Sequence, residues 1–290
     1  MPSLATLPSD LRTFAKYHLR RRVYDYPAPE TELGVESLGF DLEDYVAELW
    51  GFAGDFDVQD EVEVLYRERA HPIVSVSSRA NAERTVLVLA GVHGNEHAGL
   101  LAVPRILRRF LSETPATRLV VLAPVNPVGA AEQSRYNGDG FDINRDFIRF
   151  ETVEARLVRD VIAREAPAFI VSLHEGPQDA SFMFANQHVG DETARDLLAA
   201  VADGGSVLAE RDYFGLKLKR RGYSPSTRTT RAINAAWART LRMKTTGGFA
   251  GDLGIPEITL ESSWRQLDSD ARIRPHVDLV AALCTILAAG

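Results

Sequence analysis

The chain has 290 residues, of which 45% are hydrophobic and 25% are charged, and its formal net charge is −7. The hydrophobic share is enough for one large packed domain and excludes an intrinsically disordered chain. The mildly acidic balance argues against nucleic acid as the main partner, because phosphate binding needs a dense basic patch. We therefore interpret the basic cluster Arg20-Arg21-Arg22 as a solvated helix end.

The single cysteine, Cys284, excludes an internal disulfide and lies in an apolar run, where it is expected to be a small buried hydrophobic residue. The N-terminus lacks a charged region followed by an apolar one, and no apolar stretch approaches ~18 residues. We expect no secretory signal, no membrane span and a cytoplasmic location.

The first 60 residues show mixed patterns. Ser9-Asp10 fits the N-cap of a helix that runs through Phe14 and Leu19. Acidic residues then crowd among aromatic ones between Asp41 and Glu63. We expect residues 1–60 to form a helical and irregular segment that packs on the core.

From residue 61 onward, strands and helices alternate, which predicts an α/β sandwich. The segments expected to be strands are Glu61–Arg67, Pro72–Ser77, Arg84–Ala90, Arg118–Pro124, Ala168–Leu173 and Ile258–Leu260. The segments expected to be helices are Glu96–Leu111, Thr152–Glu165 and Asp278–Ala289. A long loop, Val125–Phe147, lies between them.

The first motif, Gly91-Val92-His93-Gly94-Asn95-Glu96-His97, directly follows the apolar strand Arg84–Ala90. The carboxyl end of a parallel strand is where α/β sheets carry their sites, and the two glycines permit a sharp turn. His93 can project from this turn, and Glu96, three residues later in the first helical turn, can share a metal ion with it. The alternative is a polar turn in which Glu96 only interacts with the helix dipole.

His174 ends the next apolar strand, in the sequence Val-Ser-Leu-His-Glu-Gly. A lone histidine in this position is more often structural. Together with His93 and Glu96, however, it completes two nitrogens and one carboxylate, the ligand set of a catalytic zinc with a position left for water. Glu175, next to it, is a candidate to support the ligands from outside.

The long loop contains Arg135 and Arg145. Loops of this length are uncommon in a compact domain unless they carry function. The arginines can hold a substrate carboxylate or stabilise an oxyanion. The alternative is a glycine-rich loop held together by Asp–Arg pairs.

The segment Pro256–Glu261 places Glu257, Thr259 and Glu261 on one face of a strand. A carboxylate beside an activated water can serve as general base and then as general acid. The alternative is an ordinary strand with acids on its solvent side.

Taken in order, these motifs resemble the zinc carboxypeptidase family and its relatives, the succinylglutamate desuccinylase and aspartoacylase enzymes. The resemblance covers about residues 61–290, and it rests on the segments HGNE, NPVG, RYNGDGFDINR, LHEG and PEITLE. It implies an α/β fold with a mixed, mostly parallel sheet between helices, and a catalytic domain over residues 61–290.

The resemblance also implies a role for each matching residue. His93, Glu96 and His174 would bind one zinc ion, and Glu261 would activate the water. The loop would contribute the remaining side chains: Arg135 to hold the oxyanion, and Asn144 and Arg145 to bind the terminal carboxylate of the substrate.

One feature of the family is missing. Its peptidases carry a tyrosine shortly before a Gly-Gly pair, and this tyrosine folds over the substrate. Here Gly247-Gly248 follows Arg242–Thr246, which contains no tyrosine. Tyr213 and Tyr223 are the candidates to replace it.

Rival interpretations remain. His93, Glu96 and His97 also fit the inverted zincin motif, which needs both histidines on one helix. The substrate is expected to be a small peptide, cleaved next to a free carboxylate, or alternatively an N-acyl amino acid. A third possibility is a zinc-binding module without catalytic activity. The sequence does not indicate an oligomeric state.

Overall fold

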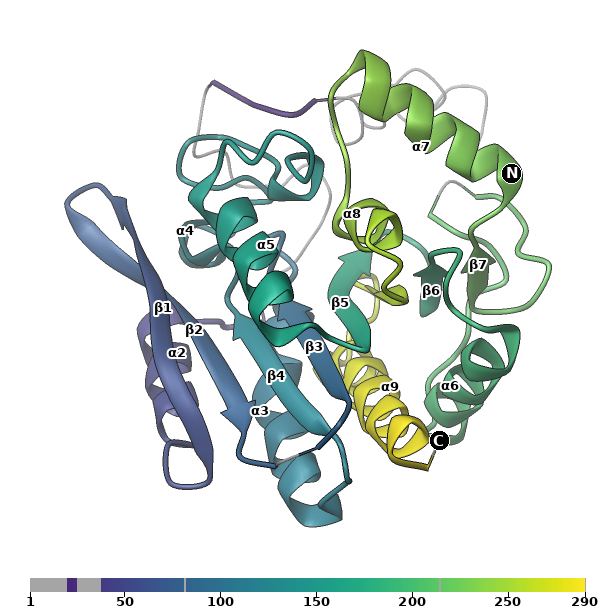
Figure 1. Ribbon diagram of the computed structural model, residues 1–290, viewed down its shortest axis with the longest axis horizontal. Coiled ribbons are helices and arrows are strands. Elements are labelled where there is room, and N and C mark those ends of the chain that lie inside the picture. The colour runs from purple at the N-terminus through teal and green to yellow at the C-terminus, as the bar shows by residue number, and fades with distance from the viewer. Residues whose placement is uncertain (1–19, 25–37, 81, 214, 290) are drawn as a thin grey trace.

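The computed structural model describes residues 20–24, 38–80, 82–213 and 215–289. The helix expected after Ser9-Asp10 lies outside the described residues. Figure 1 shows a central twisted sheet with helices on both faces. The predicted α/β fold with a mixed, mostly parallel sheet is confirmed.

Within the described residues the sheet has eight strands in the order β1-β2-β4-β3-β5-β8-β6-β7. The strands are β1 (Phe56–Tyr66), β2 (Arg69–Ser78), β3 (Thr85–Ala90), β4 (Arg118–Ala123), β5 (Phe169–Gly176), β6 (Phe182–Ala185), β7 (Tyr223–Pro225) and β8 (Glu257–Ser263). The central strands β4, β3, β5 and β8 are parallel, whereas β1, β2 and β6 join through antiparallel pairs. The carboxyl ends of β3, β5 and β8 therefore meet at one edge of the sheet.

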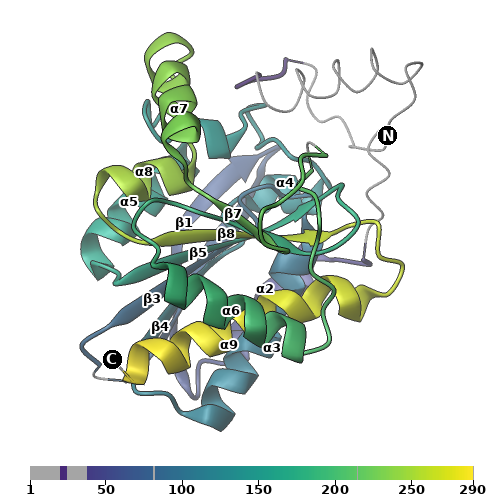
Figure 2. The same ribbon diagram turned by 90° about the vertical axis from the view of Figure 1, so that its right-hand side faces the viewer.

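Helices cover both faces of the sheet (Figures 1 and 2). One core cluster packs beneath α2 (Leu42–Trp50), α3 (His97–Glu113), α6 (Asp191–Asp203) and α9 (Ser269–Ala289). The cluster on the other face includes residues of α5 (Val153–Glu165) and α8 (Thr246–Asp252). The remaining helices are α4 (Pro127–Ala131), the 3₁₀ helix η2 (Ile143–Arg145) and α7 (Arg228–Thr240).

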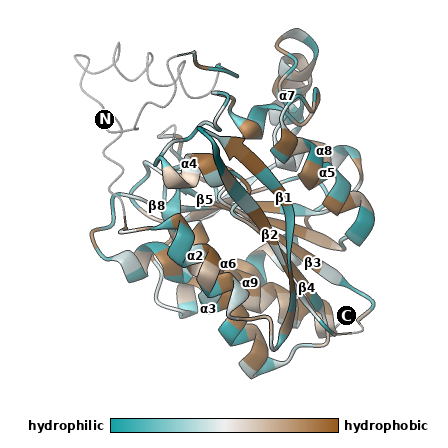
Figure 3. Cartoon of the chain, turned by 90° about the vertical axis from the view of Figure 1, so that its left-hand side faces the viewer, coloured by the Kyte–Doolittle hydropathy of each residue, from teal (hydrophilic) through white to brown (hydrophobic). Residues whose placement is uncertain are grey.

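The burial of side chains explains why the sequences of the central strands are continuous apolar runs. Every residue of β3 and β5 is buried, as expected for strands covered on both faces. In the edge strand β1 only Phe56 is buried, and the other residues are partly or fully exposed. Figure 3 shows the same contrast between a hydrophobic centre and a more polar outside.

The predicted division at residue 60 falls inside β1, and the division itself stays a prediction. Leu49 of α2 and Phe52 and Phe56 just after it belong to the same core cluster as β3 and β5. At least this part of the N-terminal segment packs on the core.

Two further expectations concern Cys284 and the membrane. Cys284 is buried within α9, with 1% of its surface exposed. Among the described residues, no helix combines the length and the apolar character needed to cross a bilayer.

Candidate metal centre and active site

A tight turn after β3 carries the first two predicted ligands. Gly91 has φ +72°, a conformation that favours glycine, and it redirects the chain as the strand ends. At Gly94 a Cβ atom would lie 1.9 Å from the backbone carbon of Gly129, so the turn packs directly against the start of the long loop. The glycines of the HGNE and NPVG motifs are thus needed for this close approach.

The three predicted ligand side chains converge. Ligand atoms of His93, Glu96 and His174 all lie within 4.8 Å of one another, and all three residues are buried. Nδ1 of His93 is 2.8 Å from Oε1 of Glu96, and Nδ1 of His174 is 2.6 Å from Oε2 of Glu96. The two Nδ1 atoms are 3.1 Å apart.

Asp142 fixes the orientation of the His93 ring. Its Oδ1 lies 3.2 Å from Nε2 of His93. Because an ionised carboxylate can only accept, Nε2 carries the proton and the lone pair of Nδ1 faces Glu96 and His174. Arg135 donates from Nε and Nη2 to Oδ2 of Asp142, at 3.0 and 2.9 Å. Burial alone would raise the pKa of Asp142, but Arg135, Arg145 and His93 hold it well below its usual range.

This donor set fits a divalent cation. Two imidazole nitrogens and a carboxylate with buried lone pairs face one another, and only protons or a cation can satisfy them together. The two histidines also hold the pKa of Glu96 well below its usual range, although burial opposes this. Two nitrogens and one carboxylate are the protein ligands of many catalytic zinc sites.

Glu175 is engaged elsewhere. Arg272 of α9 donates to its carboxylate from Nε and Nη2, at 2.8 and 3.1 Å. The backbone N–H of Ala98, in the first turn of α3, donates to Oε2 at 2.9 Å. Glu175 thus ties α9 and α3 to the end of β5 directly beside His174.

Glu261 lies one strand away from His174. In the parallel pairing of β5 and β8, the Cα atoms of His174 and Glu261 are register partners. Burial and the neighbouring Glu96 raise the pKa of the Glu261 carboxyl well above its usual range, while Arg135 and Arg145 oppose the shift. Register partners on adjacent strands direct their side chains to the same face of the sheet, so Glu261 lies on the face that carries His174.

The loop arginines and Asn144 line the same region. Nη1 of Arg135 lies 3.3 Å from Nδ1 of His93 and 3.7 Å from Oε1 of Glu96. Arg145 is buried and donates from Nη1 to the carbonyl oxygen of Asn144. The Oδ1 atom of Asn144 accepts from the backbone N–H of Thr246 at 2.9 Å, which leaves its Nδ2 as the donor that a ligand can use.

Comparison with known proteins agrees with this geometry. Residues 82–169 match the family model of the succinylglutamate desuccinylase/aspartoacylase catalytic domain. A segment of 108 residues is 30% identical to Carboxypeptidase 2 of Trichophyton tonsurans, over 35% of this chain and 20% of that protein's length.

Solved structures extend the similarity to most of the chain. A metallo-carboxypeptidase from Pseudomonas aeruginosa superposes with a TM-score of 0.63 at 15% identity, over 86% of this chain and 69% of that one. A succinylglutamate desuccinylase/aspartoacylase from Rhodobacter sphaeroides gives a TM-score of 0.52 at 18% identity, over 86% and 68%. The predicted family resemblance is confirmed. The chain has the fold shared by these metallo-carboxypeptidase and succinylglutamate desuccinylase/aspartoacylase structures.

The inverted zincin alternative requires a geometry that the structure does not have. His93 precedes α3, which begins at His97, so the two histidines do not share a helix. The His97 ring stacks on Phe40 at 4.7 Å, and its Nε2 lies 3.3 Å from the carbonyl oxygen of Ala130. His97 therefore packs between the core and α4, away from the carboxypeptidase-like ligand cluster.

The two tyrosines considered as replacements lie on opposite faces of the sheet. Tyr223 is the register partner of Met183 in β6 and belongs to the core cluster beneath α6 and α9. The Tyr213 ring packs on Phe182 and Phe184, at 5.8 and 5.4 Å between centroids. Phe182 is the register partner of Glu261, so Tyr213 lies on the face that carries Glu261.

Sequence reasoning named the loop that contains Asp142 but gave this residue no role. The R-x-N-x-x-G-x-D-x-N-R spacing contains two acids between the arginines, Asp139 and Asp142. The fixed acid of this pattern is Asp142, whereas Asp139 falls on a variable position. The structure agrees, because Asp142 is fully buried and Asp139 is exposed. The motif thus indicated the residue, but only the folded loop shows that it contacts His93.

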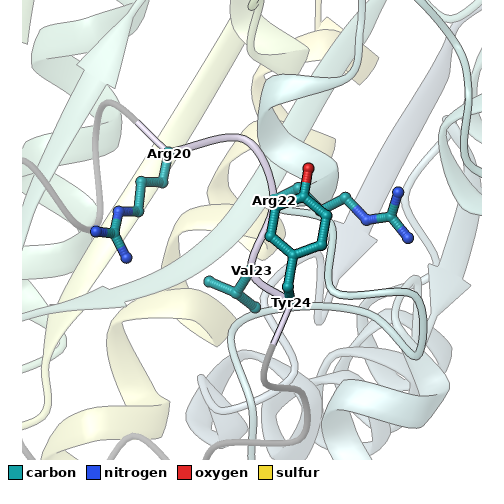
Figure 4. Close-up of a pocket in the computed structure, with 4 residues that line it drawn as sticks. All are labelled: Arg20, Arg22, Val23 and Tyr24. Carbon is teal, nitrogen blue, oxygen red and sulfur yellow. The ribbon is translucent and has the colours of Figure 1, made fainter.

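The Arg20–Tyr24 segment lies against the outside of this loop. The backbone N–H of Asp142 donates to the carbonyl oxygen of Arg21, and the Arg22 guanidinium lies 4.5 Å from the Phe141 ring. These residues are not helical, so the expected helix end at Arg20-Arg21-Arg22 is wrong for the described part. An open depression of about 480 Å³ is lined by Arg20, Arg22, Val23 and Tyr24 (Figure 4), none of which is a predicted site residue.

Proposed function

We propose that the chain is a zinc-dependent hydrolase that cleaves an amide bond next to a free carboxylate. The observation that carries this proposal is the buried cluster of His93, Glu96 and His174 beside Glu261. The fold that it shares with metallo-carboxypeptidases supports the same conclusion.

In the proposed reaction, each side chain has one task. Zinc held by His93, Glu96 and His174 would supply a Lewis acid that polarises the substrate carbonyl and acidifies the attacking water. Glu261 accepts a proton from that water and returns it to the leaving amine. Arg135 donates from Nη1 to the carbonyl oxygen as negative charge develops there.

The substrate's free carboxylate is assigned to Arg145 and Asn144. A buried guanidinium and the Nδ2 donor of Asn144 are suited to hold a carboxylate, because charge-assisted hydrogen bonds are strong where water is excluded. Both residues come from η2, which the Thr246 contact fixes to α8. This pairing would set the distance between the free carboxylate and the scissile bond.

The test of the reaction is Glu261→Gln. This change keeps the size of the side chain but removes its basicity. We expect the variant to bind zinc with the stoichiometry of the wild type and to lose nearly all kcat on the best amide substrate.

Two matched variants separate the possible bases. Glu257→Gln changes a carboxylate on the same face of β8, where it accepts a hydrogen bond from Thr259. Glu175→Gln changes the carboxylate that Arg272 holds. Wild-type turnover in Glu261→Gln, with loss in one of the other two, would move the base to that residue. Zinc binding without hydrolysis in the wild type would favour a catalytically inactive module.

A second candidate function is the deacylation of N-acyl amino acids. It is favoured by the match of residues 82–169 to the succinylglutamate desuccinylase/aspartoacylase catalytic domain. The Pseudomonas aeruginosa enzyme, by contrast, is a carboxypeptidase in complex with (2-guanidinoethylmercapto)succinic acid. A panel of short peptides and N-acyl amino acids, compared by kcat/KM, separates the two. Turnover of acyl amino acids without any peptide cleavage would replace the carboxypeptidase assignment.

A further inference from the structure

Tyr213 lies beside the residues to which the proposed chemistry is assigned. Strand β6 runs antiparallel to β8, and Phe182 and Phe184 are register partners of Glu261 and Thr259. Directly opposed residues of such a pair have their side chains on the same face of the sheet. Since Tyr213 packs on both phenylalanines, its ring covers β6 next to the Glu261 side chain.

The charges around Tyr213 agree with this position. Burial raises the pKa of its phenol above the usual range, and Glu261 adds to the shift. Arg145 and Arg135 oppose it. The hydroxyl is thus under the influence of the general base and of both site arginines, and it stays protonated over the ordinary pH range. A neutral phenol in this position can donate a hydrogen bond.

Hydrogen bonds within the turn that contains Tyr213 fix the backbone on either side of it. Asp212 is buried, and its Oδ1 accepts from the backbone N–H of Leu216 at 2.9 Å. Its backbone N–H donates to the carbonyl oxygen of Leu216, and its carbonyl accepts from Gly215. Gly215 has φ +76° at the turn. Both residues that flank this turn, Arg211 and Lys217, pair as an antiparallel bridge.

We propose that Tyr213 contacts the substrate and donates its hydroxyl to it, beside Glu261. This inference rests on the proposed amide hydrolysis. It gives this chain the substrate-contacting tyrosine that its Arg242–Thr246 segment lacks. The phenol comes from a different part of the chain, the segment between α6 and β7, and its ring packs over β6.

The test compares Tyr213→Phe with Tyr223→Phe. The phenylalanine at 213 keeps the packing on Phe182 and Phe184 and removes only the hydroxyl. We expect kcat/KM of Tyr213→Phe to fall by about 10- to 100-fold, the loss that corresponds to one hydrogen bond to a charged group. Zinc content and the midpoint of urea unfolding should match the wild type.

Tyr223→Phe is the matched control, because it removes a hydroxyl from the opposite face of the same sheet. Its kcat/KM should stay within about twofold of the wild type. A Tyr213→Phe enzyme as active as the wild type would overturn the inference and leave the proposed hydrolysis intact. A wild type that hydrolyses no amide would instead overturn the proposed function, and the inference with it. If Tyr213→Phe lost zinc or unfolded at a lower urea concentration, to an extent that accounts for its loss of activity, Tyr213 would have a structural role. That result would also overturn the inference.

Discussion

Asp142 orients a proposed metal ligand without belonging to the proposed ligand set. It accepts from Nε2 of His93 and from Arg135, so it fixes both the tautomer of His93 and the position of the Arg135 guanidinium. Residues that orient metal ligands from outside commonly affect affinity almost as much as the ligands do. Its burial, with no exposed surface, makes the interaction insensitive to solvent screening.

We therefore expect Asp142→Asn to weaken zinc binding by about 10- to 100-fold. The amide keeps the size of the carboxylate but loses the charge that holds His93 and Arg135. The dissociation constant can be measured by competition with a chelator of known affinity. Asp139→Asn is the control, since Asp139 is exposed on the same loop. Equal zinc affinity in the two variants would contradict the role assigned to Asp142.

At the scale of elements, α9 holds the end of β5 that carries His174. Arg272 and Glu175 form an ion pair with at most 2% of either side chain exposed. The pair joins α9 to the end of β5, and the Ala98 N–H adds α3 to the same carboxylate. Removing one partner of a buried pair leaves an uncompensated charge, which costs far more than the net contribution of the pair.

Arg272→Met should accordingly destabilise the fold by roughly 3–5 kcal/mol, measured by urea unfolding. The double variant Arg272→Met/Glu175→Gln removes both charges and should recover a large part of this loss. Arg274→Met, on the same helix but with 41% of the side chain exposed, should cost much less, because exposed ion pairs contribute little to stability. A single variant at 272 as stable as the one at 274 would show that Glu175 does not depend on Arg272.

The elements that the sequence predicts well are those with a clear apolar period. Thr152–Glu165 was predicted as a helix, and α5 has the same end and an N-cap at Thr152 that accepts from Ala155. The stretch between β5 and β8 was not predicted. There β6 and β7 are short, and α8 contains three glycines within Thr246–Asp252. Helix α7 is amphipathic but buries none of its residues. Helix α9 begins earlier than expected because its polar first turns, with Pro275, do not look helical.

In the candidate site, too, some residues could be predicted from the sequence and others could not. His93, Glu96 and His174 could be predicted as ligands because each lies in a recognisable motif, at the carboxyl end of a buried strand or just after it. Tyr213 could not be placed, because its position depends on the register of β6 against β8 and on a turn with no motif of its own. The long loop was expected to lack regular structure, but it contains α4 and η2, which are too short to give a periodic signal.

At the scale of the whole molecule, the strand order assembles the site. Because β3, β5 and β8 are adjacent and parallel, residues far apart in the sequence meet at their carboxyl ends, as in other open α/β sheets. The site therefore exists only in the folded sheet. A ligand that binds only the folded state stabilises it, so zinc binding and folding should be linked.

Buried acids make the stability of the molecule depend on pH. Glu154 of α5 is 2% exposed, and Asn137 donates from Nδ2 to both of its carboxylate oxygens at 3.1 Å. Burial raises the pKa of Glu154 from 4.5 to about 7, against the effect of Asn137. Burial likewise raises the pKa of Glu257 to about 7. The fold thus keeps both carboxyl groups largely neutral below about pH 7.

The sign of the effect follows from these raised values. Between about pH 4.5 and pH 7 the folded state binds more protons at Glu154 than the unfolded state does, so stability falls as the pH rises. The loss due to Glu154 is at most about 3 kcal/mol, and it is complete above its folded pKa. Glu154→Gln cannot ionise, and its Oε1 can still accept from Asn137. We expect its free energy of unfolding to decline less than that of the wild type between pH 5 and pH 8. Ionisation of Glu257 should account for part of the decline that this variant still shows. Glu192→Gln, exposed on α6, should follow the wild-type curve. Parallel curves for Glu154→Gln and the wild type would mean that Glu154 ionises as easily in the folded chain as in the unfolded one.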